Sequence, residues 1–99
     1  MGLRNSKRLP SKIQELRKTK SLTQKQMAQA LGLSEAMFSR IESGERAIQQ
    51  NQIDIIARIL EADVKELRSL SLADKIEAET HEYTEEEINH ALKVINNIK

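Results

Sequence analysis

The chain has no cysteine and no tryptophan, and it has only three glycines, one proline and two aromatic residues. Without cysteine there is no disulfide, no thiolate nucleophile and no cysteine-ligated zinc site. Three glycines cannot form a phosphate-binding or dinucleotide-binding loop, and two aromatic rings cannot form a base-stacking platform for single strands or RNA. No apolar run approaches the roughly 18 residues of a membrane span, and the N-terminus lacks the apolar region of a signal peptide. The lack of cysteine fits a reducing cytosol but does not establish it.

What the chain does contain is charge, and this charge is segregated. The chain has 99 residues, of which 38% are hydrophobic and 31% are charged, which is typical of one globular domain and leaves room for one appended element. The net charge of +1 hides a basic segment, residues 1–20, with a net charge of +6, and an acidic segment, residues 74–87, with a net charge of −6. Two interpretations carry equal weight: a polyanionic partner at the basic end, or an ordinary solvated surface.

Apolar residues recur at helical spacing in six segments, and no alternation typical of strands is present. The expected helices start at Pro10, after Thr23, after Ser34, at Gln52, after Asp63 and after Thr84. The second and third end at Gly32 and Gly44. A polar loop is expected at 45–51 and a break at 79–83, and the fifth helix is expected to reach about Ile76. The pattern predicts an all-α fold.

The strongest signal lies in residues 23–43, TQKQMAQALGLSEAMFSRIES. Ala28 is small enough to let two short helices cross closely, and Gly32 tolerates the positive φ that a rapid chain reversal requires. Four apolar residues can seal the crossing from inside: Leu31, Leu33, Phe38 and Ile41. This spacing is typical of a helix-turn-helix unit, whose second helix enters the DNA major groove.

With these residues in view, the sequence resembles the phage repressor and Cro-type helix-turn-helix domains, the XRE family. The resemblance covers about residues 13–70 and rests on IQELRKTKSLTQKQMAQALGLSEAMFSRIESGER and IIARILEADVKEL. It implies a five-helix, cytoplasmic DNA-binding domain that binds operator DNA as a dimer. We therefore expect a basic N-terminal arm at 1–10, a helix-turn-helix domain at 11–72, and an acidic linker with an additional C-terminal amphipathic helix at 73–99.

Since Phe38 and Ile41 face inward, the outward face of the third helix carries the candidates for contact with base edges. These are Ser34, Glu35, Ala36, Ser39 and Arg40. Arg40 can bind guanine in a bidentate manner, Glu35 can accept from cytosine, and Ala36 can contact a thymine methyl group. The resemblance places the base-reading positions of the family on the same three residues. The alternative for each is a solvated helix face.

Contacts to the DNA backbone are expected on both sides of this helix. The candidates for phosphate contact are Gln24, Ser43, Arg46, Gln49 and Gln50. Gln24 lies in the first turn of the second helix, where free N–H groups favour an anion, and the resemblance gives the matching glutamine this role. Weaker candidates are Lys12, Arg17 and Lys20, and the arm residues Arg4, Lys7 and Arg8, for which disorder is an equal alternative. The resemblance also implies a structural pair between Arg17 and Glu42.

The remaining apolar residues indicate self-association. Ile55 and Ile59 lie on a second face of the fourth helix, and the apolar stripe of the last helix, with Leu92 and Ile95, also needs a cover. We expect these four residues at a homodimer interface, because one short recognition helix offers too little contact for specific binding. The stripe of the last helix either folds back on its own domain or pairs across the dimer.

No enzyme, metal site or cofactor is expected. His81-Glu82-Tyr83-Thr84-Glu85 begins like a zinc-protease motif but lacks its second histidine, and adjacent carboxylates at 85–87 serve better as charges at a helix start. The sequence predicts a transcriptional regulator, acting as a repressor, that binds a palindromic operator as a dimer. The alternative is a protein-interaction module, an antitoxin or adaptor, whose C-terminal helix binds a partner protein.

Overall fold

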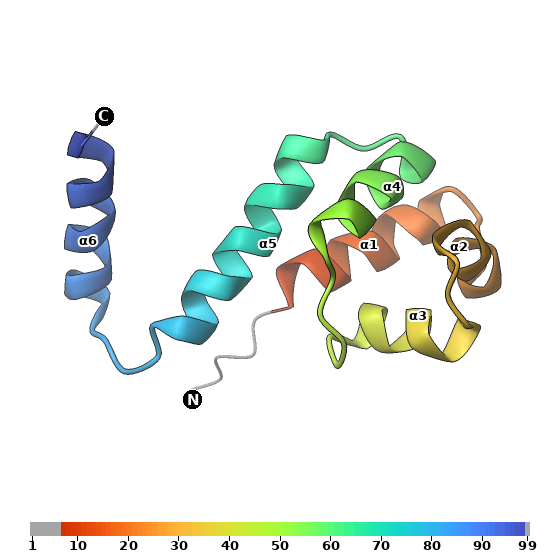
Figure 1. The fold of residues 1–99 in the computed structure, drawn as a ribbon, viewed down its shortest axis with the longest axis horizontal. Helices are drawn as coiled ribbons and strands as arrows, with labels where there is room; N and C mark the ends of the chain where they lie inside the picture. The colour runs from red at the N-terminus through yellow and green to blue at the C-terminus, as the bar shows by residue number, and fades with distance from the viewer. Residues whose placement is uncertain (1–6, 99) are drawn as a thin grey trace.

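The computed structural model describes residues 7–98, with the side chains of residues 7–97, and it is entirely helical in these residues apart from turns. Six helices follow one another along the chain (Figure 1). They are α1 (Arg8–Thr19), α2 (Gln24–Leu31), α3 (Glu35–Ser43), α4 (Gln50–Leu60), α5 (Val64–Glu79) and α6 (Glu85–Ile98). The all-α fold predicted from the sequence is confirmed.

Side-chain caps start the helices at the positions expected. The hydroxyl of Thr23 accepts a hydrogen bond from the backbone N–H of Gln26 at 3.0 Å, and the carboxylate of Asp63 accepts from Lys65 at 2.9 Å. Thr84 and Glu87 form the predicted reciprocal capping box at the start of α6, with bonds of 2.9 and 3.1 Å. Each cap satisfies backbone donors that have no partner inside the helix.

Three helix boundaries differ from expectation. α1 begins at Arg8, so the predicted start at Pro10 was two residues late: a proline is tolerated in the first helical turn, and both Leu9 and Pro10 are buried. α4 begins at Gln50 within the expected loop, and α5 continues to Glu79. The N-terminal arm predicted at 1–10 therefore has its last three residues in α1, and residues 1–6, with Arg4, lie outside the described residues.

The hydrophobic core is built from α1 to α5 alone. Its largest fully buried side chains are Ile13, Met27, Phe38, Ile41, Ile53, Ile56, Leu60 and Leu67. α6 stands beside this body in Figure 1, and no Cα atom of α6 lies within 8 Å of a Cα atom in another helix. The core consequently holds α2 and α3 in place without any contribution from the C-terminal helix.

Within residues 7–98, no helix combines the length and the apolar character needed to cross a membrane.

Candidate nucleic-acid interface

The conformation of α3 is determined at both of its ends and along its inner face. Ser34 caps its start by accepting a hydrogen bond from the backbone N–H of Met37 at 3.1 Å. Gly44 ends it in the left-handed conformation, at φ +84°, where a glycine carries no steric penalty. Between these ends, Phe38 and Ile41 are 0% exposed. Because both inner side chains are fully buried, the orientation of the outer face is determined as well.

The predicted base-contact residues all lie on that outer face and are all exposed: Ser34, Glu35, Ala36, Ser39 and Arg40. Among the described residues, the Arg40 guanidinium forms no ion pair. The face therefore presents a cationic fork, a carboxylate, hydroxyl groups and a methyl group to the solvent. These are the groups that read hydrogen-bond donors, acceptors and thymine methyl groups in a major groove.

The turn between α2 and α3 has the geometry that the sequence pattern predicts. Gly32 adopts φ +71°, and the backbone N–H of Leu33 donates to the carbonyl of Ala28 at 2.8 Å, which closes the end of α2. Ala28 is buried at the helix crossing, with 2% exposure. Leu31 and Leu33 pack against the core from its edge. The short reversal thus holds α3 at a set angle to α2.

A buried polar network ties α3 to α1 and α2. Arg17 of α1 binds the carboxylate of Glu42 through Nε at 2.6 Å and through Nη2 at 3.1 Å, and Nη1 donates to the carbonyl of Leu22 at 2.8 Å. Gln24 of α2 donates from Nε2 to the same carboxylate at 2.9 Å. The side chain of Glu42 is only 2% exposed. The structural role implied for Arg17 and Glu42 is the one observed, and the weaker expectation of a phosphate contact by Arg17 is wrong because its guanidinium is committed to this network.

The same network changes the interpretation of Gln24. The sequence predicts that its amide donates to a phosphate, whereas the structure shows one amide hydrogen bound to Glu42 and the residue half-buried. A phosphate contact by Gln24 stays a prediction and would use its second amide hydrogen or the free N–H groups of the α2 start. Sequence spacing did not reveal the bond to Glu42, because the two residues meet only when the helices cross.

The other candidates for phosphate contact surround the C-terminal end of α3. Ser43 and Arg46 are exposed, and the Ser43 hydroxyl donates to the carbonyl of Arg40 at 3.0 Å. Gln49 and Gln50 are exposed at the start of α4, where the side chain of Gln52 accepts from the backbone N–H of Gln49 at 2.9 Å. This cap explains why α4 starts at Gln50, two residues before the predicted start at Gln52. It also replaces the end of the predicted loop at 45–51 with a helix start, which favours anions.

Lys7 belongs to the predicted N-terminal arm, and its side chain lies against the end of α3. A Cβ atom added to Gly44 would lie 2.8 Å from Cδ of Lys7, so the aliphatic part of Lys7 crosses the C-terminal end of α3. This places the side chain of Lys7 at the edge of the candidate surface, beside the end of α3. No sequence signal indicates this contact, because the two residues are 37 positions apart.

Two of the other basic candidates, Arg8 and Lys20, have acidic partners elsewhere. Arg8 binds Asp74 at 3.1 Å and Glu77 at 2.9 Å, and the bonds to Glu77 and Asp74 raise the pKa of Arg8 above its ordinary value. Lys20 pairs with Glu61. The expected arm role of Arg8 is wrong in this structure, since its guanidinium connects the start of α1 to α5.

Comparison with known families supports the geometric interpretation. The family model described as a helix-turn-helix domain matches residues 11–70, which extend from the first turns of α1 into α5. Comparison with curated proteins and with solved structures gives no match. The match covers well over half of the chain and includes every residue of the α2–α3 unit, so the chain belongs to the helix-turn-helix domain family, a family of DNA-binding proteins.

Proposed function

We propose that this protein is a sequence-specific, double-stranded DNA-binding transcriptional regulator of the phage repressor and Cro type. In this proposal it acts as a repressor in the cytoplasm, without catalysis, and binds a palindromic operator as a dimer through α3. The observation that carries the proposal is the exposed face of α3, held by two buried apolar side chains and the Arg17–Glu42 pair. The family match and the resemblance to the XRE family support it.

The contacts at the surface support an ordered division of roles. Arg40 and its neighbours on α3 face the base edges, while Ser43, Arg46 and the start of α4 lie at the end of α3, where a DNA backbone would pass. Lys7 adds a cation on the same side. The contacts to the DNA backbone set the position of α3, and the contacts to base edges select the sequence.

Selection of bound sequences from random duplexes by the purified full chain tests the proposal. We expect an enriched palindromic motif with two half-sites, because a two-fold dimer presents two copies of α3. A selection that enriches no motif would contradict sequence-specific binding. Enrichment of a single, non-repeated half-site would contradict the dimeric mode and leave the DNA-binding assignment in place.

Arg40→Ala then tests the assignment of residues. It removes one bidentate base contact and should weaken binding to the selected operator by about 1–3 kcal/mol, roughly 5-fold to 150-fold, with little change on a scrambled duplex. Arg58→Ala is the matched control, since Arg58 is an exposed arginine in the last turn of α4, away from α3. Fluorescence anisotropy titrations with both duplexes measure the effect. Equal losses for the two variants would argue that Arg40 acts only through its charge.

The exposed apolar side of α6 favours a second candidate function, a module that binds a partner protein. Leu92 and Ile95 are 40% and 55% exposed, which is unusual for large apolar side chains in a closed domain. Deletion of residues 84–99 separates the two candidates. If DNA binding by α3 is the main function, the deletion reduces affinity through the dimer only, and Arg40→Ala weakens operator binding in both forms.

A further inference from the structure

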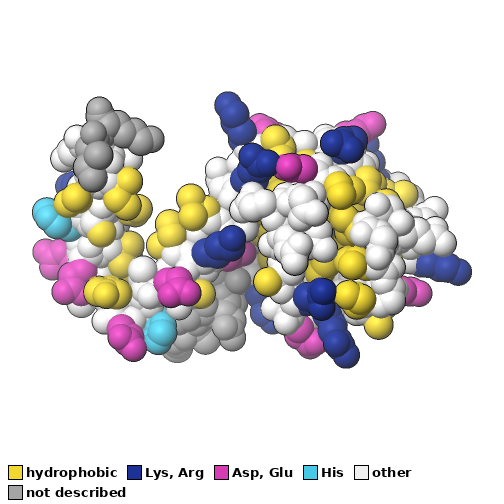
Figure 2. All heavy atoms as spheres, in the orientation of Figure 1, with side chains coloured by type: hydrophobic (Ala, Val, Ile, Leu, Met, Phe, Trp, Pro, Cys, Tyr) yellow, Lys and Arg dark blue, Asp and Glu magenta, His cyan; other side chains and the backbone are white. Residues whose placement is uncertain are grey.

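The exposed apolar surface of this chain is concentrated in its C-terminal part. The large hydrophobic side chains that are exposed in residues 7–97 are Leu72, Tyr83, Leu92, Val94 and Ile95, at 58%, 58%, 40%, 47% and 55%. In Figure 2, hydrophobic side chains gather on the side of α6 that faces α5 and on the neighbouring surface of α5. A surface of this kind, next to a core that buries its own apolar residues completely, indicates an interaction site.

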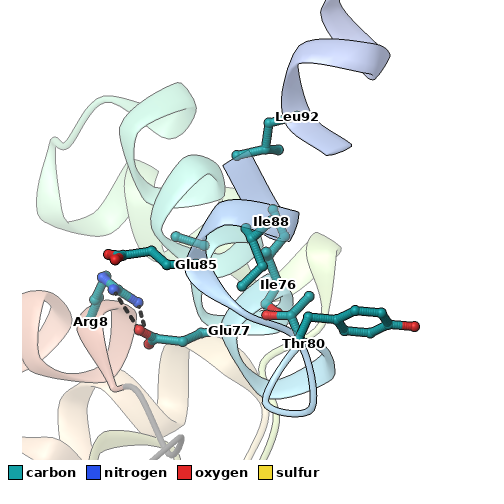
Figure 3. A pocket seen from close by; sticks show the side chains of 9 residues that line it. Arg8, Ile76, Glu77, Thr80, Glu85, Ile88 and Leu92 are labelled. Carbon is teal, nitrogen blue, oxygen red and sulfur yellow. Dashed lines mark hydrogen bonds and ion pairs between the residues drawn. The ribbon is translucent and has the colours of Figure 1, made fainter. Parts of the chain in front are cut away.

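This surface forms a groove between α5 and α6. The groove has a volume of about 530 Å³, and Ile76 of α5 and Ile88, Leu92 and Ile95 of α6 line it, with Tyr83 from the connecting turn. Figure 3 shows Ile76, Ile88 and Leu92 around the adjoining part of the groove, with the Arg8–Glu77 pair at its edge. No other helix of residues 7–98 comes within 8 Å of α6, measured between Cα atoms. An uncovered helix of 14 residues is marginal in water, so α6 needs a cover to be stable.

The apolar stripe of α6 matches itself when it is reversed. Ile88, Ala91, Leu92 and Ile95 are arranged symmetrically about the midpoint between residues 91 and 92. In an antiparallel pair centred there, Ile88 of one copy meets Ile95 of the other, and Ala91 meets Leu92. A two-fold interface requires this kind of self-complementary surface.

The charges of α6 favour the same orientation. Its first turn carries Glu85, Glu86 and Glu87, and its last turn carries no basic residue. Antiparallel pairing keeps the two acidic first turns apart and opposes the helix dipoles. Parallel pairing would place three carboxylates against three carboxylates. The charge pattern therefore favours a second copy in the reversed direction.

The size of the stripe indicates that α5 takes part as well. A helix of this length is about 21 Å long, and one face about 10 Å wide covers only about 200 Å². A stable interface buries about 800 Å² on each partner, so pairing of α6 alone is too small. Ile76 on the groove wall of α5 supplies additional apolar surface, and the exposed Leu72 lies about one helical turn before it.

We propose that the α5–α6 groove is the subunit interface and that its occupant is α6 of a second copy, in antiparallel orientation, so that α5 and α6 of two chains form a four-helix bundle. The proposal rests on the dimer of the proposed function and deepens it by naming its surface. It differs from an interface on α4, where Ile55 is half-buried and Ile59 packs against the core. α6 and α3 lie at opposite ends of the molecule in Figure 1, so this interface leaves the DNA-binding face of both copies uncovered.

Sedimentation equilibrium of the full chain tests the interface directly. We expect a dimer for the unmodified chain and at least a tenfold weaker dimer for Leu92→Asp, which places a charge at the centre of the stripe. His90→Asp is the matched control, because it adds the same charge in the middle of α6 on the opposite, exposed face. Circular dichroism checks that α1–α5 remain folded in both variants. A monomer at all concentrations, or equal dimerisation of the two variants, would overturn the proposal.

Single cysteines test the orientation, since the natural chain has no cysteine to interfere. Residue 91 lies next to the proposed two-fold axis. The thiol of Ala91→Cys should therefore form a disulfide with the same cysteine of the second subunit under mild oxidation. Ile88→Cys should not do so alone but should cross-link when mixed with Ile95→Cys, and His90→Cys should remain reduced. Efficient cross-linking of Ile88→Cys with itself would indicate parallel pairing and overturn the proposed geometry.

The same variants, combined with the DNA selection, distinguish the proposed interface from the proposed function. If the Leu92→Asp variant is monomeric and still enriches the same half-site, both the interface and the DNA-binding role are supported. A dimer with the expected cross-links that enriches no DNA sequence would leave the interface standing and remove the operator-binding function. A monomer that binds a single half-site would remove the interface and leave DNA binding in place.

Discussion

The carboxylate of Glu42 connects three helices through side-chain hydrogen bonds. It is 2% exposed, and it accepts from Arg17 of α1 and from Gln24 of α2 while it belongs to α3 itself. A buried ion pair of this kind adds little net stability compared with apolar residues, but removing one partner leaves an uncompensated charge. Glu42 therefore serves mainly to hold α3 in one orientation, which is what recognition of a defined base sequence requires.

Glu42→Ala should lower the free energy of unfolding by about 3 kcal/mol, because Arg17 would remain buried without its partner. Urea denaturation followed by circular dichroism measures this change. Glu45→Ala, at an exposed position three residues further on, is the control and should change stability by less than about 0.5 kcal/mol. A similar small effect for Glu42→Ala would mean that the network relaxes freely and does not orient α3.

At the scale of the elements, α2 and α3 are short helices with side-chain caps at both starts. Thr23 caps α2 and Ser34 caps α3, and each hydroxyl accepts from a backbone N–H at about 3 Å. Their ends at Gly32 and Gly44 are both left-handed. Because helices of eight and nine residues are too short to be stable alone, their stability depends on these caps and on packing against the core.

The two caps allow a matched comparison. Thr23→Ala and Ser34→Ala should each lower the free energy of unfolding by about 1 kcal/mol, since each removes one N-cap acceptor. Only Ser34 lies on the exposed face of α3, so only Ser34→Ala should also alter the operator preference. Thermal denaturation measures the first effect and operator titration the second. Equal effects on DNA binding would show that Ser34 acts through helix stability rather than through contact.

At the scale of the whole molecule, the two proposed functional surfaces are separated along the longest dimension. The proposed DNA-binding face lies at α3, and the α5–α6 groove lies at the other end (Figure 1). Glu77, Glu85 and Glu87 of the acidic segment 74–87 lie around the groove. Asp74 and Glu77 bind Arg8 and so hold the start of α1 against α5. Asp74 also lines a hollow together with Gly44 and Arg46, which places its carboxylate near the C-terminal end of α3.

The salt dependence of operator binding follows from this arrangement. Affinity should fall steeply with salt, with a logarithmic slope of about −0.9 for each phosphate neutralised. Lys7→Ala should make this slope shallower by about 1 for each contact removed and weaken all sequences equally, since Lys7 lies beside Gly44 at the end of α3. Lys65→Ala, an exposed lysine at the start of α5, should leave the slope unchanged. An unchanged slope for Lys7→Ala would remove Lys7 from the DNA-binding surface.

The number of helices, most of their caps and the inward face of α3 were determined by the sequence itself. Capping residues, terminal glycines and the spacing of Phe38 and Ile41 are local signals, and they act within one helical turn. The starts of α1 and α4 were missed because a buried Leu9 and the Gln49–Gln52 cap carry no periodic signal. Local chemistry therefore sufficed for the existence of the helices and for the exposure of Arg40.

The tertiary structure alone decided which distant side chains meet. The bond from Gln24 to Glu42, the crossing of Lys7 over Gly44 and the pairing of Arg8 with Asp74 and Glu77 join residues that are between 18 and 69 positions apart. It also decided that α6 is left outside the core. Such contacts depend on how the helices pack against one another, and side-chain packing in three dimensions has no period in the sequence that would reveal it.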